Sequence, residues 1–227
     1  LQVGTGNLSL AAENKKADKK IENSVKQNNT VATTEYGKIQ GFVQDGIYTY
    51  LGVPYATAER FMPPKKLEKW NGVKQTVNFG TYFSQDKGVV SARSAWFAGP
   101  DLKMSENSHN LNIWTPALRD EKKRPVMVWL HGGGFRSGSS AENYIFDGKN
   151  LSKKGDVVVV SVNHRLNSLG FLDLSAYGKK YKNSANAGIM DLVASLEWIR
   201  DNIEEFGGDP NNVTIFGESG GGAKVLT

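Results

Sequence analysis

One serine in the sequence has neighbours that favour nucleophilic chemistry. Residues 217–221 read Gly-Glu-Ser-Gly-Gly, the pattern G-x-S-x-G. Where such a run joins a strand to a helix, the turn is so tight that side chains two residues before and two after the serine would collide. Glycines at 217 and 221 remove both side chains. We therefore interpret Ser219 as a candidate nucleophile for acyl transfer, held on a turn of the nucleophile-elbow type.

The same residues have a second interpretation, a glycine-rich turn that binds phosphate and contains an incidental serine. A Walker-type loop needs Gly-Lys-Ser/Thr after its glycines, and a dinucleotide-binding turn needs G-x-G-x-x-G. The stretch around Ser219 supplies neither. Acyl transfer is therefore the preferred hypothesis.

A second glycine run complements the serine. Residues 126–130 are apolar and lead directly into His131, three glycines at 132–134, and Phe135. Glycines let backbone N–H groups face a substrate oxygen with no Cβ in the way. We expect the N–H groups of Gly133, Gly134 and Gly220 to form an oxyanion hole, which stabilises negative charge that develops during acyl transfer. A triple glycine also occurs in ordinary loops, so its weight comes from the pairing with Ser219.

Buried strands and a helix must place these two runs together. Apolar runs predict strands at 111–115, 125–130, 157–162 and 213–216. Apolar residues spaced three and four apart predict a helix over 186–206, which Gly207 and Gly208 end. A further helix is expected from Gly220 onward. Strands that alternate with helices predict an α/β fold with a mostly parallel central sheet.

The N-terminal third has a different pattern. Residues 1–29 are rich in Lys, Asn, Glu and Ala, and we interpret them as a flexible or partly helical leader. Three β-rich segments, 31–36, 39–43 and 47–51, predict a small antiparallel meander. Residues 57–105 contain many Gly and Pro and are expected to form a loop-dominated excursion. We therefore assign residues 30–227 to one catalytic domain.

Composition excludes several classes of protein. The net charge is +5, but the sequence lacks a dense Lys/Arg stripe with interleaved aromatics, so no nucleic-acid partner is expected. No apolar run is long enough to span a bilayer. The absence of cysteine excludes disulfides and thiolate chemistry, fits a bacterial source, and does not choose between cytoplasm and exterior. His109, His131 and His164 lack metal-binding spacing, and we expect neither a metal nor a cofactor.

Several motifs stand in a fixed order along the chain: 50–56 with Arg60, 105–107 with 111–113, 129–138, 161–166 with 169–171, and 206–221. Together they resemble the type-B carboxylesterase family, which includes cholinesterases and bacterial para-nitrobenzyl esterases. Hormone-sensitive-lipase-like esterases share the triple glycine and the serine turn but lack the stretches around Arg60 and Ser105. The resemblance covers 31–227 and implies the N-terminal part of an α/β-hydrolase fold.

The resemblance also implies roles for individual residues. Ser219 is expected to be acylated by a small-molecule ester, with Gly133, Gly134 and Gly220 as donors to the oxyanion. Glu218 is expected to line the pocket in a supporting role. Structural ion pairs are implied between Arg60 and Glu106 and between Arg165 and Asp191.

The sequence departs from the family pattern at five positions. Ser108 stands where many relatives have cysteine, His109 and Asn110 replace apolar or aromatic residues, His164 replaces tyrosine, and Gly220 replaces the commoner alanine. These departures put the tightness of the turn and of the oxyanion site in question, but they leave the nucleophile in place.

The acid and the histidine of a triad are not found after Ser219. In this fold they follow the nucleophile in the order acid, then histidine. Only eight residues follow Ser219, and none is acidic or histidine. The three histidines lie upstream, and His131 is expected to point into strand packing. We therefore expect a C-terminal remainder of the same protein to carry the acid and the base.

Two functions remain after the sequence analysis. The first is a serine carboxylic ester hydrolase that acts through an acyl-enzyme on Ser219. The second is a non-catalytic, cholinesterase-like binding or adhesion module. Such modules typically lose the serine, so its retention here favours the hydrolase. Tyr82, Phe83, Trp96 and Phe97 are either a pocket wall or ordinary loop packing.

Overall fold

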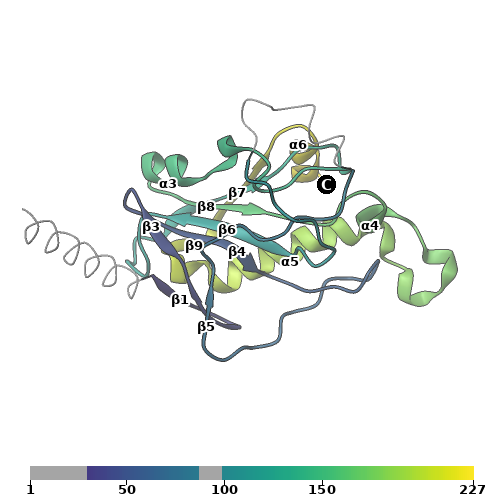
Figure 1. Ribbon diagram of the computed structural model, residues 1–227, viewed down its shortest axis with the longest axis horizontal. Helices are drawn as coiled ribbons and strands as arrows, with labels where there is room; N and C mark the ends of the chain where they lie inside the picture. Colours follow the sequence, from purple (N-terminus) through teal and green to yellow (C-terminus); the bar gives the residue numbers. More distant parts are fainter. Residues whose placement is uncertain (1–29, 87–98) are drawn as a thin grey trace, which may run out of the picture.

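The computed structural model describes residues 30–86 and 99–227. The central element is a six-stranded sheet in the order β3-β4-β6-β8-β7-β9, which crosses the middle of the molecule (Figure 1). Its strands are β3 (Phe42–Gln44), β4 (Ile47–Pro54), β6 (Asn110–Thr115), β8 (Val158–Val162), β7 (Arg124–Leu130) and β9 (Gly208–Gly217).

Strand direction divides this sheet into two halves. Pairing is parallel between β8 and β7 and between β7 and β9. Pairing is antiparallel from β3 through β4 and β6 to β8. The expected parallel arrangement therefore holds for the three strands nearest Ser219, and the described sheet as a whole is mixed. An apolar run such as 111–115 indicates burial on both faces but carries no information about direction.

The expected N-terminal meander is split between two sheets. Strands β1 (Val31–Thr34) and β2 (Gly37–Gln40) form an antiparallel hairpin, and β2 also pairs in parallel with β5 (Val73–Gln75). The next hairpin, β3–β4, belongs to the central sheet. The chain changes sheets at Gly41, where an added Cβ would lie 2.2 Å from the carbonyl oxygen of Thr49. Only glycine permits this close approach at the point where the chain passes from one sheet to the other.

Helices cover both faces of the central sheet. Helix α5 (Ala187–Asn202) continues into a 3-10 turn, η5 (Ile203–Phe206), and lies along one face, whereas α3 (Lys149–Gly155) lies on the opposite side (Figure 1). This confirms the helix predicted over 186–206. The remaining elements are α4 (Asn167–Phe171), α6 (Gly220–Val225), and the 3-10 turns η1 (Tyr144–Phe146), η2 (Ser175–Tyr177), η3 (Lys179–Tyr181) and η4 (Ser184–Asn186).

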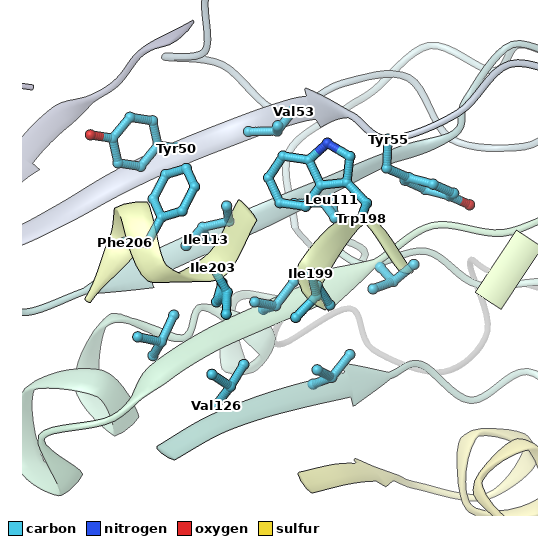
Figure 2. Close-up of a cluster of buried hydrophobic side chains, with 14 of the residues drawn as sticks. Tyr50, Val53, Tyr55, Leu111, Ile113, Val126, Trp198, Ile199, Ile203 and Phe206 are labelled. Atoms are coloured by element: carbon cyan, nitrogen blue, oxygen red, sulfur yellow. The ribbon is translucent and has the colours of Figure 1, made fainter. Parts of the chain in front are cut away.

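The core is built from the alternating faces of the strands. Val158, Val160 and Val162 face a cluster that contains Ile199 and Phe206, while Val157 and Val159 join a second cluster on the other face. Figure 2 shows the first cluster, in which the ring of Phe206 meets Tyr50 edge-on at 5.0 Å between centroids. Because β8 is buried on both faces, its position between β6 and β7 is well determined, and the positions of β7 and of its neighbour β9 follow from it.

Outside the sheets, the stretch from residue 57 to residue 105 is irregular over most of its described part, apart from β5 and isolated bridges. The expected leader, residues 1–29, lies outside the described residues. Within the described ranges, no helix combines the length and apolar character needed to cross a membrane.

Both ion pairs implied by the resemblance are present, in contrasting surroundings. Arg60 and Glu106 pair at the surface, with side chains 60% and 41% exposed. Arg165 and Asp191 pair in the interior with two bonds, Nε to Oδ2 at 2.8 Å and Nη2 to Oδ1 at 2.6 Å. Arg165 also donates to the carbonyl oxygen of Met62 at 2.7 Å. The buried pair therefore ties α5 to the loop after β8 and to the excursion after β4.

Asp191 has a second partner that the sequence did not predict. Nε2 of His109 lies 3.1 Å from Oδ1 of Asp191, and both side chains are buried. Burial alone would raise the pKa of Asp191, but the hydrogen bonds from Arg165 and His109 outweigh burial and hold that pKa below its usual range. His109 and Arg165 thus share the buried carboxylate of Asp191.

We predict that Asp191→Ala lowers the free energy of unfolding by about 3–5 kcal/mol, because it leaves the Arg165 guanidinium buried without its counter-ion. Glu106→Ala is the matched control and should cost far less, because its partner Arg60 is solvated. Urea unfolding of the two variants beside the parent protein measures the difference. Equal losses would contradict a structural role specific to the buried pair.

Candidate functional site

The two glycine runs leave the sheet at the same edge. Strands β7 and β9 are parallel neighbours, and Leu130 is paired with Gly217 in their ladder. The residues that follow, 131–135 after β7 and 218–221 after β9, therefore start side by side. This is the placement that the sequence predicted for the triple glycine and the serine.

The chain reverses sharply from β9 into α6 at Ser219. Ser219 has φ 53° and ψ −120°, a backbone conformation that side-chain-bearing residues rarely adopt and that costs on the order of 1–3 kcal/mol. A Cβ on Gly217 would lie 2.5 Å from the carbonyl carbon of Gly221, and one on Gly221 would lie 1.9 Å from the oxygen of Leu130. Both glycines are therefore required, as the sequence analysis expected.

The loop after β7 turns its backbone by means of positive φ angles. Gly133 has φ 86° and Gly134 has φ 58°. The carbonyl oxygen of Gly133 accepts bonds from the amides of Arg136 and Ser137, at 3.0 and 3.2 Å. In the described part of the chain, neither Gly133 nor Gly134 donates its amide to any acceptor. These two amides are therefore available to bind an oxygen atom of a ligand.

The loop and the turn touch through their backbones. A Cβ on Gly220 would lie 2.6 Å from the amide nitrogen of Gly134. A Cβ on Gly132 would lie 2.6 Å from Oε2 of Glu218 and 3.5 Å from Cβ of Ser219. An added Cβ at 132 or 220 would therefore press on the opposite segment. Glycine at both positions brings Gly134 and Ser219 to one place, with Ser219 and Glu218 exposed to solvent.

The histidines nearest the glycine loop are buried in packing. His131 and His164 stack with ring centroids 5.0 Å apart and planes 15° apart, and neither is exposed. Burial, with the charge of Lys224 as a second cause, lowers the pKa of His131 to about 3 and that of His164 well below its usual range. Both rings are therefore neutral at physiological pH. The expectation that His131 points into strand packing is confirmed.

Two contacts at the site were missed by the sequence analysis. The Gln85 side chain bonds both backbone groups of Gly138, donating to its oxygen at 2.9 Å and accepting from its amide at 2.6 Å. Lys224 in α6 donates to the carbonyl oxygen of His131 at 2.9 Å. The sequence held a signal for Lys224 alone, since it lies three residues after Gly221 and shares its inward helix face.

The aromatic residues considered as a pocket wall are only partly described. Phe83 is buried and meets the ring of His109 at 4.9 Å between centroids, which is ordinary loop packing. Tyr82 is half-buried and forms an isolated bridge to Met104. Trp96 and Phe97 lie outside the described residues. Across residues 30–86 and 99–227, no group of three or more His, Asp or Glu side chains is arranged to hold a metal ion.

Comparisons with known proteins agree on one family. The model of the carboxylesterase family matches residues 28–227. The chain is 38% identical over 199 residues to the para-nitrobenzyl esterase of Bacillus subtilis, which covers 86% of this chain and 39% of that relative.

Solved structures give the same result. An esterase from anaerobic Clostridium hathewayi that can hydrolyze aliphatic aromatic polyesters has a TM-score of 0.78 and 48% identity, covering 86% of this chain and 39% of that one. A carboxylesterase of Geobacillus stearothermophilus has a TM-score of 0.76 and 42% identity, covering 86% and 40%. The chain therefore spans less than half the length of the proteins it resembles.

We predict that alanine is tolerated very differently at two glycines of α6. Gly220→Ala should lower the free energy of unfolding by about 1–3 kcal/mol, because its Cβ would press on the backbone of Gly134. Gly222→Ala places its Cβ 3.5 Å from the nearest atom outside its own helix turn, an ordinary contact. It should be neutral or stabilising by up to about 1 kcal/mol. Urea unfolding decides, and similar values for the two variants would show that the loop moves aside at no cost.

Proposed function

The chain belongs to the carboxylesterase family, and on that premise we propose that it carries the nucleophile and the oxyanion donors of a serine carboxylic ester hydrolase. The observation that carries the proposal is the backbone contact between the glycine loop and the turn at Ser219. The bacterial relatives and the lack of cysteine support a bacterial source.

In the proposed reaction, Oγ of Ser219 bonds to the carbonyl carbon of a small-molecule ester. The π electrons of the carbonyl move to its oxygen, and the serine proton passes to a base. As the tetrahedral intermediate collapses, the carbonyl re-forms and the C–O bond to the alcohol breaks, the protonated base gives its proton to the leaving oxygen, and an acyl group remains on Ser219. Water then attacks the acyl-enzyme and releases the carboxylic acid, which regenerates the serine. The strained turn supports this role because it holds the serine side chain at the sheet edge in solvent.

The amides of Gly133, Gly134 and Gly220 are the proposed oxyanion hole. The unused amides of Gly133 and Gly134, together with the contact between Gly134 and Gly220, support this assignment. One such donor contributes about 10²–10³ in rate in other hydrolases. Glu218 is proposed to support the pocket, because its carboxylate lies against Gly132 beside Ser219.

The acid and the base of the triad are proposed to come from a C-terminal remainder of the same protein. Strand β9 pairs with β7 on one side, and the described residues place no strand on its other side. Val213, Ile215 and Phe216 of β9 are only half-buried, although they are apolar. An unpaired apolar edge beside a catalytic turn favours further strands at that position.

A non-catalytic binding or adhesion module is the alternative function. Such a module does not need a serine in a strained backbone conformation, which lowers stability without serving binding. Ser219, Gly217 and Gly221 are all present, and the relatives named above are described as esterases. Both observations favour the hydrolase.

We predict that a fluorophosphonate probe labels the complete protein at Ser219 and that Ser219→Ala abolishes labelling. Ser168→Ala is the matched control, because Ser168 is also exposed but lies in a different element, α4. Mass spectrometry of the labelled peptides identifies the modified residue. Absence of labelling in the folded, complete protein would favour the binding module.

We also predict that the edge of β9 is covered in the complete protein. Hydrogen exchange of amides in 213–216 should then be as slow as in the central strand β7, since added strands would bond them. The other edge strand, β3, serves as an internal control for an open edge. If β9 exchanges as fast as β3, the remainder does not pair with it.

A further inference from the structure

Helix α6 carries a lysine that points into the protein five residues after the proposed nucleophile. Lys224 is 5% exposed. Its Nζ donates to the carbonyl oxygen of His131 at 2.9 Å and lies 5.3 Å from the centroid of the Phe135 ring. A buried ammonium group is costly unless it is bonded, so these contacts fix where the side chain ends.

The two groups that Lys224 contacts lie at the two ends of the glycine loop. His131 immediately precedes Gly132, and Phe135 immediately follows Gly134. The carbonyl of His131 receives a charge-assisted hydrogen bond, and the face of Phe135 attracts the same cation. One side chain therefore spans the segment that presents the amides of Gly133 and Gly134.

Two neutral rings and one carboxylate act on Lys224 among the described residues. The stacked rings of His131 and His164 are neutral, and Glu142 favours the cation from a distance. Burial lowers the pKa of Lys224 to about 8, so the charge persists at neutral pH. The bond to His131 does not depend on the charge, because a neutral amine also donates a hydrogen bond.

We propose that Lys224 is a positioning residue that holds the glycine loop against the turn at Ser219, so that the amides of Gly133 and Gly134 point at the developing oxyanion. This inference rests on the proposed esterase function. Helix α6 then positions two parts of the site. Its N-terminal end positions Ser219, and Lys224 positions the oxyanion donors.

The test compares three variants of the complete protein. Lys224→Met keeps the apolar stem but removes the donor. Lys224→Gln keeps an N–H donor without the charge. Lys154→Met is the matched control, because Lys154, like Lys224, lies in the last turn of its helix but is exposed on α3. Steady-state hydrolysis of a 4-nitrophenyl ester gives kcat and KM. Inhibition by a trifluoromethyl ketone, whose adduct with serine carries an oxyanion, measures the oxyanion site directly.

For Lys224→Met we expect kcat to fall about 10- to 100-fold, less than or comparable to the loss of one direct donor, with KM changed by less than about threefold. Affinity for the trifluoromethyl ketone should fall by the same factor as kcat/KM. Lys224→Gln should lie between Lys224→Met and the parent protein, and Lys154→Met should match the parent.

A loss of kcat without a parallel loss of ketone affinity would overturn the proposal, and so would parent-like kinetics in Lys224→Met. If Lys224→Met does not fold, Lys224→Gln decides: parent-like kcat and ketone affinity overturn the proposal, and a parallel decrease supports it. Failure of the esterase function is distinguished by the parent protein itself, which would then neither turn over the ester nor bind the ketone.

Discussion

The contact between two stretches of backbone, the glycine loop after β7 and the turn after β9, is the constraint on which the site depends. An added Cβ at residue 132 or 220 would press on the opposite stretch and require a small shift of the loop, whereas a side chain at 217 or 221 would prevent the turn from closing. Glycine loses more conformational entropy on folding than any other residue. Its use at so many neighbouring positions therefore reflects a geometric requirement that outweighs its entropic cost.

The rest of the described fold stabilises the protein enough to offset the strain of the turn at Ser219. Ser219 is held at positive φ by two parallel strands whose neighbour, β8, is buried on both faces. The buried cluster of Arg165, Asp191 and His109 joins α5 to the loop after β8 and to the residue just before β6. Hydrogen bonds from Arg165 and His109, in place of water, keep the Asp191 carboxylate charged. Packing and paired charge together make a strained turn tolerable, as is common where strain serves chemistry.

Much of this arrangement follows from sequence because it depends on local patterns. G-x-S-x-G after a strand, glycines at 132–134 and the stripe of the 186–206 helix each report a local geometry. Strand direction depends on connections that the pattern does not encode, so the antiparallel β6 and the division of the N-terminal hairpins at Gly41 were not predicted. The burial of Lys224 and the second partner of Asp191 depend on residues far away in the chain, at 131 and 109, and were missed for that reason.

The most direct measurement of the central claim is a crystal structure of the complete protein with Ser219 phosphonylated. The phosphonyl oxygen then stands in for the oxyanion of the tetrahedral intermediate. We predict that this oxygen lies about 2.7–3.1 Å from the amide nitrogens of Gly134 and Gly220. An adduct whose oxygen faces solvent, with both amides beyond hydrogen-bond reach, would contradict it.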